Sequence, residues 1–145
     1  LECEVVNRDT LSVIVKKRPQ METENLLDAY VGLRREMESY TKYLKAWNKK
    51  AALWGASHQG FTLAATTPLG KYASYIIDSA PFKQGKYAPA SHLPIVGPNH
   101  FKEQPVDAII ITAPGYTDEI ASIIRRDFGD RVEVRAIRSN HLEMV

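Results

Sequence analysis

The chain has 145 residues, 44% of them hydrophobic and 25% charged, which suits one domain with a sizeable core. A net charge of +2 gives no electrostatic reason to expect nucleic-acid binding, and the single cysteine excludes an internal disulfide and a cysteine zinc site. No apolar run approaches the roughly 20 residues of a membrane span and no signal peptide is recognisable, so we expect a cytoplasmic protein without membrane or nucleic-acid partners.

The N-terminal residues predict a β-hairpin. Residues 4–6 and 11–17 are rich in β-branched and apolar side chains, and they flank Asn7-Arg8-Asp9, which has turn chemistry. Pro19 then interrupts the pattern. Because the chain begins with Leu1 instead of Met, we expect a piece of a longer protein, with the hairpin as a remnant of whatever precedes it.

Residues 22–50 predict one long amphipathic helix. Acidic residues gather near its start and lysines near its end, as the helix dipole prefers. Its apolar residues recur alternately four and three positions apart: Leu26, Tyr30, Leu33, Met37, Tyr40, Leu44 and Trp47. This continuous apolar seam is expected to pack against its own or a neighbouring domain, and the alternative is a coiled coil that makes a homodimer.

The rest of the chain alternates between apolar strands and helices. Strands are predicted over residues 51–54, 73–77, 106–112 and 132–137, with helices at about 58–65 and 117–128. Such alternation favours a Rossmann-like α/β fold, a mostly parallel sheet with helices on both faces.

The first strand-to-helix turn, Gly55-Ala-Ser-His-Gln-Gly60, is a candidate ligand site. Ligands of open α/β sheets bind at the carboxyl ends of strands, and a helix N-terminus offers free N–H groups to an anion. The turn is neither a full dinucleotide fingerprint nor a P-loop, because Phe61 stands where the P-loop needs lysine. A tight turn that needs glycine explains the pattern equally well.

The second strand ends at Asp78, and a basic loop follows it. Asp78 lies roughly 20 residues after the glycine turn, where a Rossmann unit has its ribose-binding acid, although a turn former would also explain it. Lys83 and Lys86 are candidates for phosphate contacts and Tyr87 for stacking on a base or sugar. The alternative is a solvated surface loop. Because the third strand ends nearby, its turn at 113–116 is expected to join the same crevice.

These segments together resemble one family, the C-terminal domain of the S-adenosylmethionine-dependent sugar C-methyltransferases. The resemblance runs from about residue 22 to 128, and its most specific part is Lys83-Gln-Gly-Lys-Tyr-Ala-Pro89. The other segments that carry it are Trp54–Gly60, Ile77-Asp78 with Pro81, His92-Leu-Pro-Ile95, Asp107 and Asp118-Glu-Ile120. The chain departs from the family's usual residues at Gln59, at Ala90-Ser91 and at 113–115.

The resemblance implies a division of labour with an upstream domain. Residues 1–18 would be the terminal strands of a missing methyltransferase domain, and residues 19–145 the substrate-side domain. The upstream domain would hold S-adenosylmethionine and the proton-transfer residues, so the present chain alone would bind no cofactor, carry no catalytic or metal-binding residue and be inactive. Its acceptor would be a nucleotide-sugar-like small molecule.

We therefore predict a substrate-binding crevice without catalytic residues. The residues predicted to line it are Gly55, Ser57, His58, Gly60, Asp78, Lys83, Gln84, Lys86, Tyr87 and Tyr116. The alternatives are a dimerisation module that works through the long helix, and a stand-alone nucleotide-binding Rossmann domain.

Overall fold

The computed structural model describes residues 2–7, 10–14, 24–138 and 140–145. Strand β1 (Glu2–Asn7) pairs antiparallel with β2 (Thr10–Ile14), which confirms the predicted hairpin. Its predicted turn residues 8–9 and the last predicted strand residues 15–17 lie outside the described residues.

Helix α1 (Glu24–Ala46) confirms the long helix but ends earlier than predicted. Asn48 adopts a φ of 50°, and the amide of Lys49 donates to the carbonyl of Leu44 at 2.9 Å. A residue in the left-handed region is a common way to end a helix, because the following amides then turn back to bond its last carbonyls. Lys49 and Lys50 consequently lie beyond the helix.

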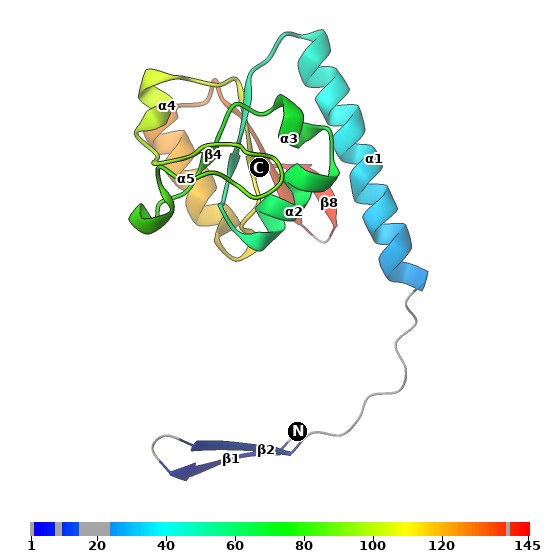
Figure 1. Ribbon diagram of the computed structural model, residues 1–145, viewed down its shortest axis with the longest axis vertical. Coiled ribbons are helices and arrows are strands. Elements are labelled where there is room, and N and C mark those ends of the chain that lie inside the picture. Colours follow the sequence, from blue (N-terminus) through cyan, green and yellow to red (C-terminus); the bar gives the residue numbers. More distant parts are fainter. Residues whose placement is uncertain (1, 8–9, 15–23, 139) are drawn as a thin grey trace.

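The apolar seam of α1 is continuous in sequence but not in packing. Met37, Tyr40 and Leu44 are buried, whereas Leu26 is 59% exposed and Trp47 is 70% exposed. Figure 1 shows the N-terminal end of α1 extending beyond the body of the fold. Packing within this chain is therefore confirmed for the buried part of the seam, and packing of its exposed ends against a neighbouring domain or a second copy stays a prediction.

Within the described residues, one sheet has the strand order β5-β4-β3-β6-β7-β8. Neighbours from β5 to β7 are parallel, and β8 runs antiparallel to β7. The bounds are β3 (Ala51–Trp54), β4 (Ile76–Ile77), β5 (Ile95–Val96), β6 (Ala108–Ile111), β7 (Glu133–Arg138) and β8 (His141–Met144). The predicted Rossmann-like, mostly parallel sheet is confirmed. The predicted strand at 73–77 shrinks to two residues, and β5 and β8 were not predicted.

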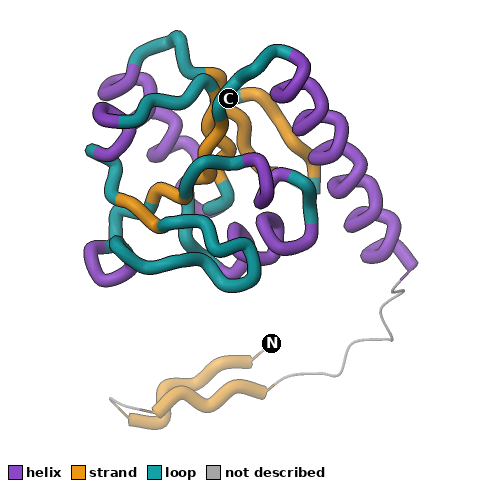
Figure 2. The backbone as a smooth tube through the Cα atoms, turned by 45° about the horizontal axis from the view of Figure 1, so that its top comes forward, coloured by secondary structure: helices purple, strands orange, loops and turns teal. Residues whose placement is uncertain are grey.

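Helices cover both faces of this sheet (Figures 1 and 2). On one face, α1 packs with α2 (His58–Thr66) and α3 (Leu69–Tyr72), and on the other lie α4 (His100–Glu103) and α5 (Thr117–Phe128). Alternate residues of β3 divide between the two cores: Leu53 points to the first and Trp54 to the second. No described helix combines the length and apolar character that a bilayer crossing requires.

A cluster of polar side chains ties α1 to β7. The carboxylate of Glu133 accepts hydrogen bonds from Tyr40 (3.1 Å), Lys49 (2.9 Å) and Arg135 (2.9 Å). Desolvation by itself raises the pKa of Glu133, but these hydrogen bonds outweigh it and lower the pKa to about 2. The same burial, together with the charge of Glu133, raises the pKa of Tyr40. The cluster therefore stabilises the ionised form of Glu133.

Helix α1 also covers the open edge of the sheet. The two carboxylate oxygens of Glu36 contact the backbone N–H of Leu142 at 2.7 Å and Nδ1 of His141 at 2.8 Å. Unpaired amides on an edge strand invite pairing with other chains, so this carboxylate protects part of β8 from self-association.

Candidate functional site

The three predicted loops meet at the carboxyl edge of the sheet. Strand β3 lies between β4 and β6, so the turns that follow these strands are neighbours. The amide of Gly55 donates to the carbonyl of Ile77 at 2.9 Å, and the hydroxyl of Thr112 lies 3.0 Å from the carbonyl of Gly55. The convergence expected from the sequence is thus present in the fold.

Both glycines of the first turn are required by its own geometry. Gly55 has a φ of +123°, which favours glycine. A Cβ on Gly60 would lie 2.3 Å from the carbonyl oxygen of Gly55 and 2.8 Å from Oγ1 of Thr112. Helix α2 can therefore approach the turn this closely only because residue 60 is a glycine. A ligand role for these two glycines stays a prediction.

Ser57 caps helix α2. Its Oγ accepts from the amide of Gly60 at 3.4 Å, and its backbone is extended, as is usual at this position. Both features explain why the residue is serine without reference to a ligand. The amides of His58 and Gln59 in the first turn of α2 have no backbone or side-chain acceptor among the described residues, so the anion-binding capacity of a helix N-terminus remains here.

Asp78 faces inward and is only 9% exposed. Its Oδ2 accepts from the amide of Ala56 at 2.8 Å and from Nζ of Lys83 at 3.0 Å, and its Oδ1 accepts from the amide of Ala80 at 2.9 Å. The carboxylate thus links the first turn to the loop after β4, and its charge is balanced by Lys83.

Gln84 belongs to the same inward-facing group. Its Nε2 donates to the carbonyl of Asp78 at 3.0 Å. A Cβ on Gly97 would lie 2.9 Å from Oε1 of Gln84, so the glutamine packs closely against that glycine. Asp78, Lys83 and Gln84 therefore order the loop from within, and we call them the inner triad.

The remaining predicted residues point outward. His58, Lys86, Tyr87 and Tyr116 are exposed, with Tyr87 at 69% and Tyr116 at 65%. Within the described part of the chain, none of these four side chains makes a hydrogen bond or an ion pair. They are consequently available to a ligand, and we call them the outer set.

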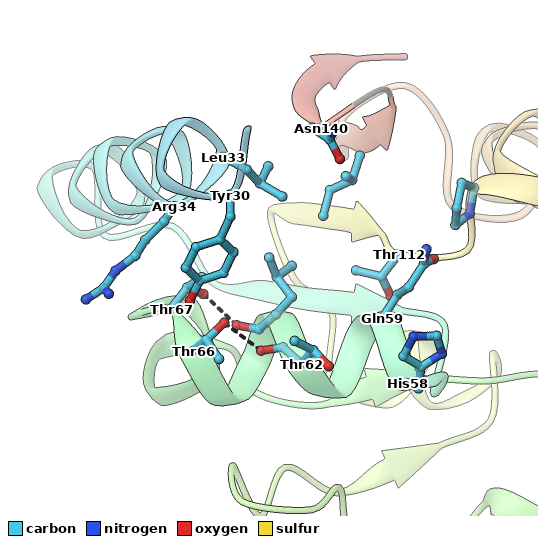
Figure 3. A pocket seen from close by; sticks show the side chains of 13 residues that line it. Tyr30, Leu33, Arg34, His58, Gln59, Thr62, Thr66, Thr67, Thr112 and Asn140 are labelled. Atoms are coloured by element: carbon cyan, nitrogen blue, oxygen red, sulfur yellow. Dashed lines mark hydrogen bonds between the residues drawn. The ribbon is translucent and has the colours of Figure 1, made fainter. Parts of the chain in front are cut away.

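A pocket of about 220 Å³ opens beside this edge, between α1, α2 and the turn from β7 to β8 (Figure 3). We call it the α1–α2 pocket. Of the predicted site residues only His58 lines it, together with Gln59 and Thr112 from the same edge. Pro114 belongs to the turn at 113–116 that was expected in the crevice, and it also lines the pocket. The rest of the lining was not predicted: Tyr30, Leu33, Arg34, Thr62, Leu63, Thr66, Thr67, Ile137 and Asn140.

One sequence pattern could have indicated part of the lining of this pocket. Thr62 and Thr66 lie four residues apart on α2, and so share a face of the helix that begins in the first ligand-facing turn. The opposite wall comes from α1 and could not be placed without the tertiary structure. Among the described residues, no group of three His, Cys, Asp or Glu side chains could hold a metal ion.

Two comparisons with known proteins give matches. The sequence model of a family described as the C-methyltransferase C-terminal domain matches residues 21–131. Among solved structures, the UDP-D-quinovosamine 4-dehydrogenase of Vibrio fischeri superposes with a TM-score of 0.51 at 18% identity, over 67% of this chain and 93% of that one. At this identity the likeness concerns the fold. A comparison with curated proteins gives no match.

Proposed function

The chain belongs to the family of C-methyltransferase C-terminal domains, and from that premise we propose that it binds the acceptor substrate of an S-adenosylmethionine-dependent C-methyltransferase. The acceptor is an anionic, nucleotide-linked sugar. The family match over residues 21–131 is the observation that carries this proposal.

The chemistry of the carboxyl edge suits an anionic, partly planar ligand. The first-turn amides of α2 and the exposed Lys86 supply donors and positive charge for phosphate oxygens. Exposed Tyr87 and Tyr116 offer aromatic faces to a sugar or base. The neighbouring acid, Asp78, is nearly buried and paired with Lys83, so it adds little repulsion toward an anion.

The role of this chain is to position the acceptor. Methyl transfer to carbon follows removal of a proton next to a carbonyl group, and S-adenosylmethionine supplies the methyl group from another part of the whole protein. Holding the acceptor in one orientation contributes to rate because the reacting atoms then meet as if in one molecule. The outer set would hold the acceptor, and the inner triad would hold the loop.

Calorimetric titration tests the proposal. The chain is titrated with UDP-glucose, dTDP-glucose, S-adenosylmethionine and NAD, and with Lys86→Met and Tyr87→Ala variants for any ligand that binds. We expect a nucleotide sugar to bind, at an affinity lowered about ten- to a hundredfold by Lys86→Met, since a charge-assisted hydrogen bond contributes about 1.5 to 3 kcal/mol. S-adenosylmethionine should not bind.

Two results would count against it. Tight S-adenosylmethionine binding by the chain would place the donor site here, and NAD binding without nucleotide-sugar binding would favour a stand-alone dinucleotide-binding domain. Lys102→Met, an exposed lysine of α4, is the control for a general loss of positive charge.

One observation favours a second function, assembly through α1. Leu26 and Leu27 are 59% and 65% exposed near the N-terminus of the helix. Sedimentation at several concentrations tests it, with a Leu26→Glu, Leu27→Glu double variant that leaves the core intact. Concentration-dependent mass that this variant abolishes would support assembly; a constant monomer mass would exclude it. Leu44 is fully buried and is therefore unsuitable for such a test.

A further inference from the structure

The α1–α2 pocket has walls suited to a flat, uncharged group. Leu33, Leu63 and Ile137 contribute apolar surface. The hydroxyls of Thr66 and Thr67 donate to the carbonyls of Thr62 and Leu63 at 2.8 Å each, as the dashed lines in Figure 3 mark. Because both hydroxyl protons are donated to backbone carbonyls, these threonines present only methyl groups and oxygen lone pairs to the pocket.

Among the described residues, five polar side chains of the pocket have no hydrogen-bond partner, and two of the five are carboxamides: Tyr30, His58, Gln59, Thr62 and Asn140. Gln59 and Asn140 line it from opposite sides, and neither side chain has a hydrogen-bond partner among the described residues. A carboxamide presents a donor and an acceptor side by side, which matches the edge of a nucleobase. Among the described residues that line the pocket none is acidic, and the one arginine, Arg34, is paired with Glu38 at 3.1 Å. The lining therefore selects a neutral group that forms hydrogen bonds.

The size of the pocket limits which part of a ligand can enter. A cavity of about 150 Å³ holds a benzene ring, so about 220 Å³ accommodates one ring or a small fused pair but not a whole nucleotide sugar. The ring of Tyr30 stands at the end of the pocket away from His58 (Figure 3). Stacking on an aromatic side chain contributes about 1 to 3 kcal/mol per base.

We propose that the α1–α2 pocket binds the nucleobase of a nucleotide-linked ligand. The inference rests on the proposed function for the class of ligand, and it adds the direction in which that ligand lies. The base enters between α1 and α2, the phosphates lie at the first turn of α2, and the sugar extends toward Lys86 and Tyr87. Because α1 forms one wall and α2 the other, the bound base also links these two helices.

A pocket-filling variant tests this directly. Thr62→Phe places a ring in the pocket from an exposed position of α2, and Ala65→Phe adds the same ring at an exposed position of that helix that does not line the pocket. Circular dichroism and urea denaturation establish that both variants fold. Uridine, thymidine, UDP-glucose and dTDP-glucose are titrated into each, with calorimetry for the nucleotide sugars and chemical-shift perturbation for the nucleosides.

We expect Thr62→Phe to weaken nucleotide-sugar binding at least tenfold and to remove nucleoside binding, and Ala65→Phe to change neither more than twofold. Nucleotide-sugar binding that Thr62→Phe leaves unchanged would overturn the inference while the proposed function stood. If the wild-type chain binds no nucleotide sugar, the proposed function fails, and nucleoside binding that Thr62→Phe abolishes would still support the base pocket. Absence of both would overturn both.

Discussion

Asp78 accepts more side-chain hydrogen bonds than any other predicted residue of the candidate site, as far as the described residues show. Its carboxylate accepts two backbone amides and one lysine ammonium, and it does so from a nearly buried position. Removing such an acceptor leaves buried donors without partners, which costs more than the hydrogen bonds themselves contribute.

We predict that Asp78→Ala lowers the free energy of unfolding by about 2 to 3 kcal/mol, because the amide of Ala56 and the ammonium of Lys83 lose their acceptor. Urea denaturation at neutral pH measures this. Lys86→Ala, an exposed member of the outer set, should change stability by less than about 0.5 kcal/mol. A fully stable Asp78→Ala variant that binds no nucleotide sugar would instead mark Asp78 as a ligand-contacting residue.

The sequence indicates which residues belong to the loop, but it does not tell the inward-facing side chains from the exposed ones. The order Asp78, Lys83, Gln84, Lys86 predicts a polar loop, yet which side chains turn inward depends on contacts with Ala56 and Gly97, and these are made by tertiary folding. The turn-former alternative for Asp78 agrees with the hydrogen bonds observed.

At the scale of elements, the loop between β4 and β5 holds a tight turn in a costly conformation. Ala90 has a φ of 61° and His92 a φ of 56°, both in the left-handed region that most side chains avoid. The amide of His92 donates to the carbonyl of Ala88 at 3.0 Å, and that of Ala88 to Leu93 at 2.8 Å, so surrounding hydrogen bonds hold the turn in place.

We predict that Ala90→Gly raises the free energy of unfolding by about 1 kcal/mol, because glycine adopts a positive φ without the steric penalty that alanine pays. Thermal or urea denaturation measures the change. The matched control is Ala65→Gly at an exposed position within α2, which should lower stability by about 1 kcal/mol. Loss of stability in Ala90→Gly would contradict the assignment of backbone strain.

Strong periodicity and clear caps were enough to predict the major elements. The prediction of a helix over 117–128 matches α5, whose acidic first turn, basic last turn and following Gly129 are local signals. Strand β5 escaped prediction because two residues are too few to show alternation, and β8 because its polar–apolar alternation spans only four residues; β5 forms by pairing with β4, and β8 by pairing with β7. The end of α1 was misplaced because Asn48, a weaker stop signal than glycine, ends the helix.

For the whole molecule, the cluster around Glu133 connects the long helix to the sheet. Its folded pKa of about 2 lies below the ordinary value of 4.5. Such a group stabilises the fold fully above pH 4.5, and this contribution disappears as the pH falls through 2.

We predict that Glu133→Gln lowers the free energy of unfolding at pH 7 by about 2 kcal/mol and makes the loss of stability between pH 5 and pH 2.5 shallower than in the wild-type chain. Urea denaturation across this pH range measures both. Glu143→Gln, on exposed β8, should leave the profile unchanged. An unaltered slope in Glu133→Gln would show that other carboxylates govern acid unfolding.

The separation of the inner triad from the outer set has a consequence for how such chains diverge. Among the described residues, the side chains of Lys86 and Tyr87 make no hydrogen bond that orders the loop, so changes of these side chains should leave folding intact. Descendants of one ancestor are then free to change the molecule they accept while keeping the same backbone. In a library randomised at these two positions, most members should remain folded, and the survivors of selection should differ in ligand rather than in stability.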